Sequence, residues 1–331
     1  MRQPTRHRHV KRVTEAALSP SGAARSRLVA SWRRSYVKHA LDPGDAQRRD
    51  RVCERQLCNI RGASGDLHVL ASDAIDRLFQ RVRMSGCGVF LTDAQGVILD
   101  QRVGDGDRAD FDGWNLTEGS DWSESSEGTN GVGTCLAEER AVIIHRDEHY
   151  SLRNIAMSCI DAPIFGPDGR LMGALDISSA RADQSGALNA LMRDAVQRSA
   201  AQIEEIAFRR AFPGARIVLI ETDSSDPAAL PGLLAVDAHD VVIGATRAAR
   251  RRFGLSSEGG PGERTLPLPC ADLLGNVGRQ GGFDGAEAAA LRRALLRSGG
   301  TASAAAKALG IGRATLYRRM KRLGLDGAPN D

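Results

Sequence analysis

The stretch AEAAALRRALLRSGGTASAAAKALGIGRATLYRRMKRLGL, residues 286–325, decides the fold of the C-terminal part of the chain. The spacing of its apolar residues predicts three short helices. The first ends at the glycine pair 299–300, after which Thr301 or Ser303 can cap the nearly all-alanine second helix. Gly310 then suits a tight turn that needs a left-handed backbone.

The third helix of this stretch covers about residues 313–323. Its inward positions, at the i, i+4 and i+7 spacing, are Leu316, Met320 and Leu323. The outward positions are Arg313, Thr315, Tyr317, Arg318, Arg319, Lys321 and Arg322. Side chains of these types donate hydrogen bonds to phosphates and to guanine edges, so we predict that the helix contacts DNA.

The charge of the C-terminal part supports this prediction. From residue 285 onward, nine Lys and Arg stand against Glu287, Asp326 and Asp331, whereas the whole chain has a formal charge of only +4. A compact basic helical unit on a nearly neutral chain is typical of a protein that binds the phosphate backbone. A basic amphipathic helix alone would be ambiguous, but the turn before it favours a helix-turn-helix that binds double-stranded DNA.

The segment closely resembles the C-terminal DNA-binding domain of the Fis family, in its Ala-x-x-x-Gly turn at 306–310 and the Leu and Met that follow. The resemblance implies base or base-adjacent contacts from Arg313, Thr315 and Arg318. It implies phosphate contacts from Arg319 and Arg322, with Tyr317 as a further outward candidate. It also implies DNA binding as a homodimer, paired through the helix at 286–298.

The upstream part predicts an α+β fold. We expect a basic N-terminal arm and helical segment at 1–60, a sensory block at 61–210, a hairpin and linker at 211–283, and the helix-turn-helix at 284–331. Within the block, two hairpins (88–93 with 97–101, and 162–165 with 171–177), a strand at 141–145 and a long exit helix at 188–208 follow from apolar runs and turn signals. The arm MRQPTRHRHVKR we interpret as a disordered tail.

The sensory block resembles the N-terminal region of bacterial regulators related to the acetoin catabolism activator. The motifs that carry the resemblance are SWR (31–33), EGTNGVGT (127–134), EHY (148–150), Cys159 with APIF (162–165), and GALDIS (173–178). The resemblance implies a GAF domain, a ligand-sensing fold with an antiparallel sheet and flanking helices. Residues 232–254 resemble the opening hairpin and helix of a PAS domain, too short for a complete one.

The full-length activators of that family hold an AAA+ ATPase between the sensory part and the Fis-type domain. In this chain none of Lys11, Lys38, Lys307 and Lys321 follows a glycine, so the G-x-x-x-x-G-K-[ST] phosphate loop does not occur. We therefore expect no ATP-driven promoter opening by this chain. We expect it instead to recruit or block RNA polymerase, or to modulate another regulator.

Seven residues are candidates to bind a small organic effector in the sensory block: Trp114, Trp122, Thr129, Asn130, His149, Asn154 and Cys159. Pockets are mostly apolar with a few placed polar groups, and core packing would explain each residue equally well. The H-x-x-E-H pattern at 145–149 resembles a zinc-peptidase motif, but it straddles a strand end and a new element, so we expect no metal, no cofactor and no catalytic residue.

The sequence also limits the location and the functional class that we expect for the protein. There is no apolar run of transmembrane length and no signal-peptide pattern, so we expect a cytoplasmic protein with no membrane partner. The favoured hypothesis is a ligand-responsive, sequence-specific transcriptional regulator, not an enzyme. Two alternatives are a thiol enzyme of the methionine sulfoxide reductase type, using Cys135 or Cys159, and a constitutive Fis-like architectural DNA binder.

Overall fold

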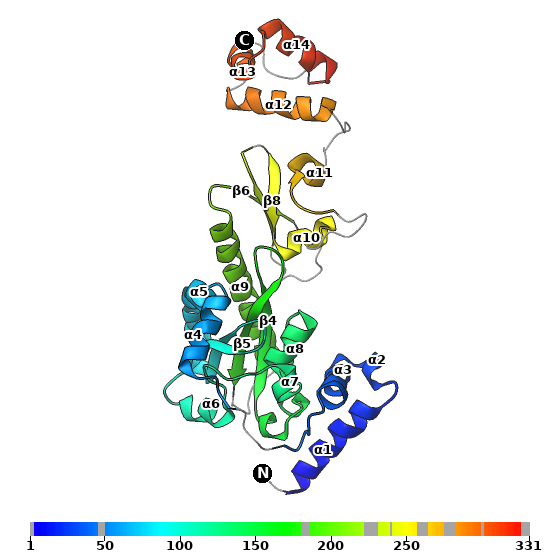
Figure 1. Cartoon of the computed structure of the whole chain (residues 1–331), viewed down its shortest axis with the longest axis vertical. Coiled ribbons are helices and arrows are strands. Elements are labelled where there is room, and N and C mark those ends of the chain that lie inside the picture. Colours follow the sequence, from blue (N-terminus) through cyan, green and yellow to red (C-terminus); the bar gives the residue numbers. More distant parts are fainter. Residues whose placement is uncertain are drawn as a thin grey trace. The chain divides into compact units, whose positions relative to one another are not determined.

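The computed structural model describes residues 3–45, 50–179, 186–221, 231–238, 240–256, 264–274, 283–298 and 301–325. The chain forms two compact units, one of residues 1–235 with 244–265 and one of 236–243 with 266–331. Figure 1 shows the elements of both. The mixture of an antiparallel sheet with helices confirms the predicted α+β class.

A five-stranded antiparallel sheet forms the centre of the first unit, in the order β2-β1-β5-β4-β3. Its strands are β1 (Cys87–Thr92), β2 (Ile98–Arg102), β3 (Val142–His145), β4 (Ser158–Phe165) and β5 (Leu171–Ser179). Both predicted hairpins and the predicted single strand are therefore present. Strand β5 is the second strand of the second hairpin, and it joins the two hairpins because it pairs with β1 as well as with β4.

Helices α5 (Leu67–Val82) and α9 (Gly186–Ala211) cover one face of this sheet, with α4 (Glu54–Ala63) and the short turn η2 (Arg83–Ser85) beside them. Alternate strand residues such as Leu91, Ile160 and Leu175 meet buried residues of both helices in one core. Because side chains alternate along a strand, the intervening residues of β1, β4 and β5 lie on the opposite face.

The opposite face is covered by the segment that connects β2 to β4. Its helices are α6 (Arg108–Trp114), α7 (Glu124–Glu127) and α8 (Gly131–Glu138), followed by the turns η3 (Arg146–Glu148) and η4 (Leu152–Asn154). A second core of Phe90, Ile98, Phe111, Leu116, Trp122, Val132, Met157 and Cys159 fills the space between this segment and the sheet.

The N-terminal arm is a helix, not the disordered tail that the basic sequence predicts. It forms α1 (Gln3–Leu18), which is followed by α2 (Gly22–Arg25), α3 (Arg27–Arg33) and the π-helical turn η1 (Arg34–Lys38). Val13 and Ala17, spaced by one helical turn, are fully buried against Trp32 and Tyr150. Apolar burial on this narrow stripe orders the helix although most of its residues are polar or charged.

The segment after α9 forms a second sheet, in the order β6-β7-β8-β9. Its elements are β6 (Arg216–Ile220), β7 (Gly232–Val236), β8 (Val241–Ala245), α10 (Arg247–Phe253), β9 (Leu268–Pro269) and α11 (Cys270–Leu274). The hairpin and helix that the sequence predicts at 232–254 are thus present as β7, β8 and α10.

The C-terminal part forms the three predicted helices, α12 (Phe283–Arg297), α13 (Ala302–Ala308) and α14 (Arg313–Arg322). Leu291, Leu316, Met320 and Leu323 are buried with Ala305 and other alanines in one small core. Gly310 takes a left-handed φ of 65°, as the turn requires. Thr301 is the residue before α13, but its side chain makes no capping hydrogen bond. The glycine pair 299–300 lies outside the described residues.

Candidate effector site and nucleic-acid interface

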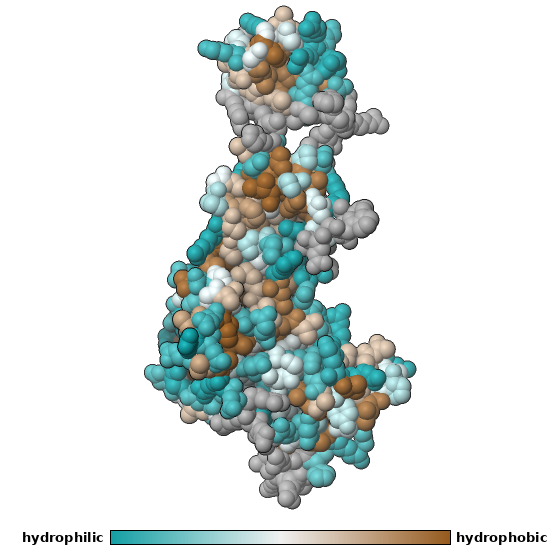
Figure 2. Space-filling model, in the orientation of Figure 1, coloured by the Kyte–Doolittle hydropathy of each residue, from teal (hydrophilic) through white to brown (hydrophobic). Residues whose placement is uncertain are grey.

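Helix α14 presents a basic face. Leu316 and Met320 are buried, whereas Arg313, Tyr317, Arg318, Arg319, Lys321 and Arg322 are exposed and Thr315 is half-buried. The helix contains no acidic residue. Figure 2 shows hydrophilic residues gathered over α14. All six predicted DNA-contact residues therefore lie on one helix, and two of them, Arg319 and Arg322, form ion pairs with another helix.

Arg319 and Arg322 form ion pairs with α12. Arg319 Nη1 lies 3.1 Å from Glu287 Oε1, and Arg322 contacts both Glu287 and Asp284, the latter at 3.4 Å. The acids of α12 thus hold the C-terminal half of α14 and partly neutralise it. Arg318 and Lys321 make no ion pair within the described residues.

The N-terminal half of α14 combines a cation with an aromatic ring. The Arg313 guanidinium lies 5.7 Å from the centre of the Tyr317 ring, whose side chain is 46% exposed. The attraction between a cation and an aromatic face is small at an exposed site. It nevertheless favours the observed orientation of the Arg313 side chain over Tyr317.

In the first unit, the sheet places a buried polar cluster beneath α8. Alternation along β4 and β5 brings Cys159, Asp161, Asp176 and Ser178 to the same face. The Ser178 hydroxyl lies 2.7 Å from Asp176 Oδ2 and 3.2 Å from Cys159 Sγ. His149 Nε2 lies 3.3 Å from the same sulfur, and its Nδ1 lies 2.9 Å from the carbonyl oxygen of Arg146. Burial lowers the pKa of His149 to about 4, so the imidazole is neutral at pH 7.

Asp161 and Asp176 are directly opposite each other in the β4–β5 register and are both fully buried. Burial raises the pKa of Asp161 well above its ordinary value and that of Asp176 to about 7. The pair therefore retains a proton near neutral pH. Neither oxygen of Asp161 accepts a hydrogen bond from a described residue. Sequence reasoning missed both carboxylates, although the alternation in GALDIS places Asp176 and Ser178 together on one face.

The predicted effector residues surround this cluster in different ways. Trp122 is buried at the centre of the second core, and its indole nitrogen donates to the Asn115 carbonyl at 3.0 Å. Trp114 packs at the edge of that core, with its ring 6.2 Å from that of Phe111. Cys159 and His149 belong to the cluster itself.

Each of the other three candidates makes a polar contact within the fold, although Asn154 Oδ1 is buried without a hydrogen-bond partner among the described residues. Asn130 is the residue that caps α8: its oxygen accepts from the Gly133 amide at 2.9 Å, and its nitrogen donates to two backbone carbonyls. The Thr129 hydroxyl lies 2.7 Å from that of Ser31. Asn154 Nδ2 lies 3.3 Å from Glu127. The structure thus brings Cys159 and His149 together with the carboxylate pair, whereas Asn130, Thr129 and Asn154 hold the surrounding segment.

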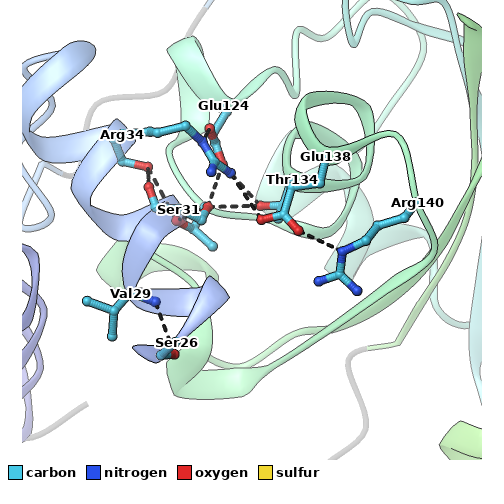
Figure 3. Close-up of polar contacts among 10 residues, drawn as sticks. Ser26, Val29, Ser31, Arg34, Glu124, Thr134, Glu138 and Arg140 are labelled. Carbon is cyan, nitrogen blue, oxygen red and sulfur yellow. Dashed lines mark hydrogen bonds and ion pairs between the residues drawn. The ribbon is translucent and has the colours of Figure 1, made fainter. Parts of the chain in front are cut away.

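A buried ion pair joins the N-terminal helices to this segment. Arg34 donates from Nε and Nη2 to the two carboxylate oxygens of Glu124, at 2.6 Å and 2.8 Å. The Ser31 hydroxyl donates to Glu124 as well, and Thr134 lies 3.4 Å away. Figure 3 shows Arg34 and Ser31 pointing from the N-terminal helices toward Glu124 and α8. Residue Ser31 of the SWR motif therefore fixes the N-terminal helices to the domain.

The cysteines do not show the features of a reactive pair. Cys135 and Cys159 are buried, and burial raises the pKa of both thiols well above the ordinary value. A thiolate, the attacking species in thiol chemistry, is therefore disfavoured at both positions. The two histidines of the H-x-x-E-H pattern have different partners, since His145 Nδ1 contacts Ser158 and His149 contacts Cys159.

Comparison with known proteins identifies both parts. The family model of the GAF domain matches residues 66–206, and that of the bacterial regulatory proteins of the Fis family matches residues 285–323. The acetoin catabolism regulatory protein of Cupriavidus necator is 30% identical over 267 residues, which are 78% of this chain and 40% of that protein. The acetoin dehydrogenase operon transcriptional activator of Bacillus subtilis is 34% identical over 110 residues, 33% of this chain and 18% of that protein.

Among solved structures, that of the E. coli DhaR(N)–DhaL complex matches with a TM-score of 0.48 and 14% identity, covering 72% of this chain and 79% of that one. The chain spans less than half the length of the curated relatives named above. No described helix has the length and apolar character needed to cross a bilayer.

These matches define the class of protein by its domains: a GAF domain and a domain of the Fis family of bacterial regulatory proteins. More particularly, the chain combines a GAF domain with a Fis-type helix-turn-helix and is distantly homologous to the acetoin catabolism regulators.

Proposed function

We propose that this protein regulates transcription by binding specific operator DNA as a homodimer, in response to a small organic effector. The observation that carries the proposal is the basic outer face of α14 within a helix-turn-helix matched by the Fis family. A GAF domain in the same chain supports an effector-sensing role.

Within α14 the two halves of the basic face have different tasks. Arg313, Thr315 and Arg318 read bases, because they lie on the outer face of the helix that the Fis family model matches. Tyr317 packs beside Arg313 and contacts the backbone of the DNA. Arg319 and Arg322 contact phosphates with the N–H groups that their ion pairs to α12 leave available. Pairing of two chains through α12 would present two such helices to an inverted repeat.

The effector enters the α8 side of the GAF domain, among the seven candidate residues. Its polar groups meet Cys159, His149 and the Asp161–Asp176 pair, while Trp122 and Trp114 supply apolar surface. Because the carboxylate pair offers acceptor oxygens without protein donors, a hydroxyl-bearing effector fits its chemistry. Acetoin has such a hydroxyl group, and two relatives are named as acetoin regulators, so it is the first compound to test.

The test is binding of the full chain to a library of fragmented genomic DNA at two salt concentrations. We expect a few sites that share an inverted repeat. Arg313→Ala and Arg318→Ala should each weaken those sites about tenfold, because one good contact to a base is worth about 1–3 kcal/mol. Arg193→Ala, at an exposed position of α9, is the matched control and should change nothing.

Two results would count against the proposal. Binding that ignores sequence would leave only an architectural role, and binding that Arg313→Ala and Arg318→Ala leave intact would remove α14 from the interface. The effector part is tested separately, by repeating the titration of one recovered site with acetoin present. Unchanged operator affinity with acetoin and with other small hydroxylated compounds would indicate a constitutive DNA binder.

A further inference from the structure

A cavity of about 720 Å³ lies in the first unit, away from the predicted effector residues. Its walls come from β4, the exit helix α9, strand β7 and helix α10. None of the seven candidate effector residues lines it. Its volume is within the range of sites for small molecules, which span about 300–1,000 Å³.

The floor of the cavity is apolar. It is made by Ala162, Pro163, Phe165, Ala200, Leu219 and Leu233. Leu219 is 63% exposed, although it is a large aliphatic residue. An apolar body placed here would remove this side chain from water, which is favourable in proportion to the area covered.

The rim of the cavity carries arginines from α10, whose sequence RAARRRF contains no acid. The Arg247 guanidinium lies 3.9 Å from the centre of the Phe165 ring and pairs with Glu139. Arg251 and Arg252 line the cavity and are exposed. These arginines place positive charge directly beside the apolar floor.

Of the acids that line the cavity, none forms an ion pair with Arg251 within the described residues. Glu139 is paired with Arg247, and Glu205 is paired with Arg209. Glu204 accepts a hydrogen bond from the Phe165 amide at 2.9 Å, and burial raises the pKa of its carboxyl to about 7. Near neutral pH a substantial fraction of Glu204 is therefore uncharged.

We propose that this cavity is a second ligand site, which binds a small amphipathic organic anion: an acidic group on an apolar body. The anionic group pairs with Arg251 at the rim, and the apolar body covers Phe165, Leu219 and Leu233. Because α9 and α10 both line the site, the anion bridges the exit helix of the GAF domain and the segment that follows it.

The test uses the full chain and the fluorescent anion 8-anilinonaphthalene-1-sulfonate as the probe. We expect saturable binding that benzoate displaces and that benzamide, which is uncharged and of similar shape, does not. Arg251→Glu should weaken probe binding about tenfold or more, because a charge-assisted contact becomes repulsive. Arg210→Glu makes the same change at an exposed position of α9 that does not line the cavity, and should bind as the wild type does.

A second variant tests whether binding needs the open volume of the cavity, independently of the charge of Arg251. Ala201 lines the cavity, so Ala201→Trp should fill it and abolish displaceable binding while the far-ultraviolet circular dichroism stays unchanged. Equal binding in wild type, Arg251→Glu and Ala201→Trp would overturn the proposal, as would displacement by benzamide as effective as that by benzoate. Because no DNA is involved in these measurements, their outcome does not depend on the proposed operator binding.

Discussion

Replacing Arg34 with methionine removes the positive partner of Glu124 and keeps a side chain of similar length. Arg34 holds both carboxylate oxygens of Glu124, at 2.6 Å and 2.8 Å. The Glu124 side chain is only 5% exposed, whereas that of Arg34 is 30% exposed. The variant therefore leaves a buried carboxylate without its counter-ion, and we expect it to destabilise the first unit.

The magnitude follows from the cost of an unpaired buried charge. Removing one partner of a buried ion pair costs about 3–5 kcal/mol. We expect the lower end, because Ser31 still donates to Glu124 in the variant and because the Arg34 side chain is partly exposed. We expect a loss of about 3 kcal/mol in the free energy of unfolding. For a unit of this size, that corresponds to a fall in Tm of about 6–12 °C.

Urea unfolding followed by tryptophan fluorescence measures this loss of stability in the first unit, which contains Arg34 and Glu124. All three tryptophans, Trp32, Trp114 and Trp122, lie in the first unit, so the signal reports on that unit. Arg27→Met, an exposed arginine on α3, is the control and should stay within about 0.5 kcal/mol of the wild type. The double variant Arg34→Met with Glu124→Gln should lose less than the two single variants together, because neither charge remains.

The reasoning is refuted if Arg34→Met costs less than about 1 kcal/mol, the value typical of an exposed ion pair. It is also refuted if the two single substitutions are additive, since additivity would mean that Arg34 and Glu124 do not interact. In either case the N-terminal helices would be held by their other contacts, such as the apolar cluster around Trp32 and the Ser31–Thr129 contact.

Four further variants test the packing. Burial raises the pKa of Glu204 to about 7, so folding favours the protonated carboxyl and this contribution to stability is lost as the pH rises from about 4.5 to 7. Glu204→Gln should therefore flatten the pH dependence of stability in that range. The same variant should raise Tm at pH 8, because it removes a buried charge. Gly131→Ala should cost about 1–3 kcal/mol in urea unfolding, since its Cβ would lie 2.0 Å from Asp161 Oδ2. Gly62→Ala, where the added methyl meets nothing within 4 Å inside α4, should instead stabilise by about 0.5–1 kcal/mol. Deleting α1 should lower the urea midpoint of tryptophan fluorescence, whereas a disordered tail could be removed without effect.

Much of the fold could be predicted because its signals are local. The hairpins of the sheet follow from apolar runs that flank turns such as PDG at 167–169, and the long exit helix follows from its helical periodicity. The helix-turn-helix was predicted for the same reason, since a glycine with a positive φ and three inward residues define it within a few turns. These features depend on residues that are close in the sequence.

The candidate site was only partly predictable because its residues meet across long separations. Asp161 is opposite Asp176 only once the register of β4 and β5 is set, and Arg34 meets Glu124 across 90 residues. The sequence predicts Arg319 as an outward residue of the third helix, but it forms an ion pair with Glu287 of α12.

The N-terminal arm shows the same difference. Its charge pattern predicted a tail, but Val13 and Ala17 find a buried surface on Trp32 and Tyr150, and that burial orders the helix. The sequence by itself therefore determined most of the helices and strands, the domain types and the basic face of α14, since periodicity, turn chemistry and net charge are local properties. Only the tertiary structure decided which charges are paired, which carboxylates share a proton and where a cavity forms, because burial and Coulomb interactions depend on distances in space and not on spacing along the chain.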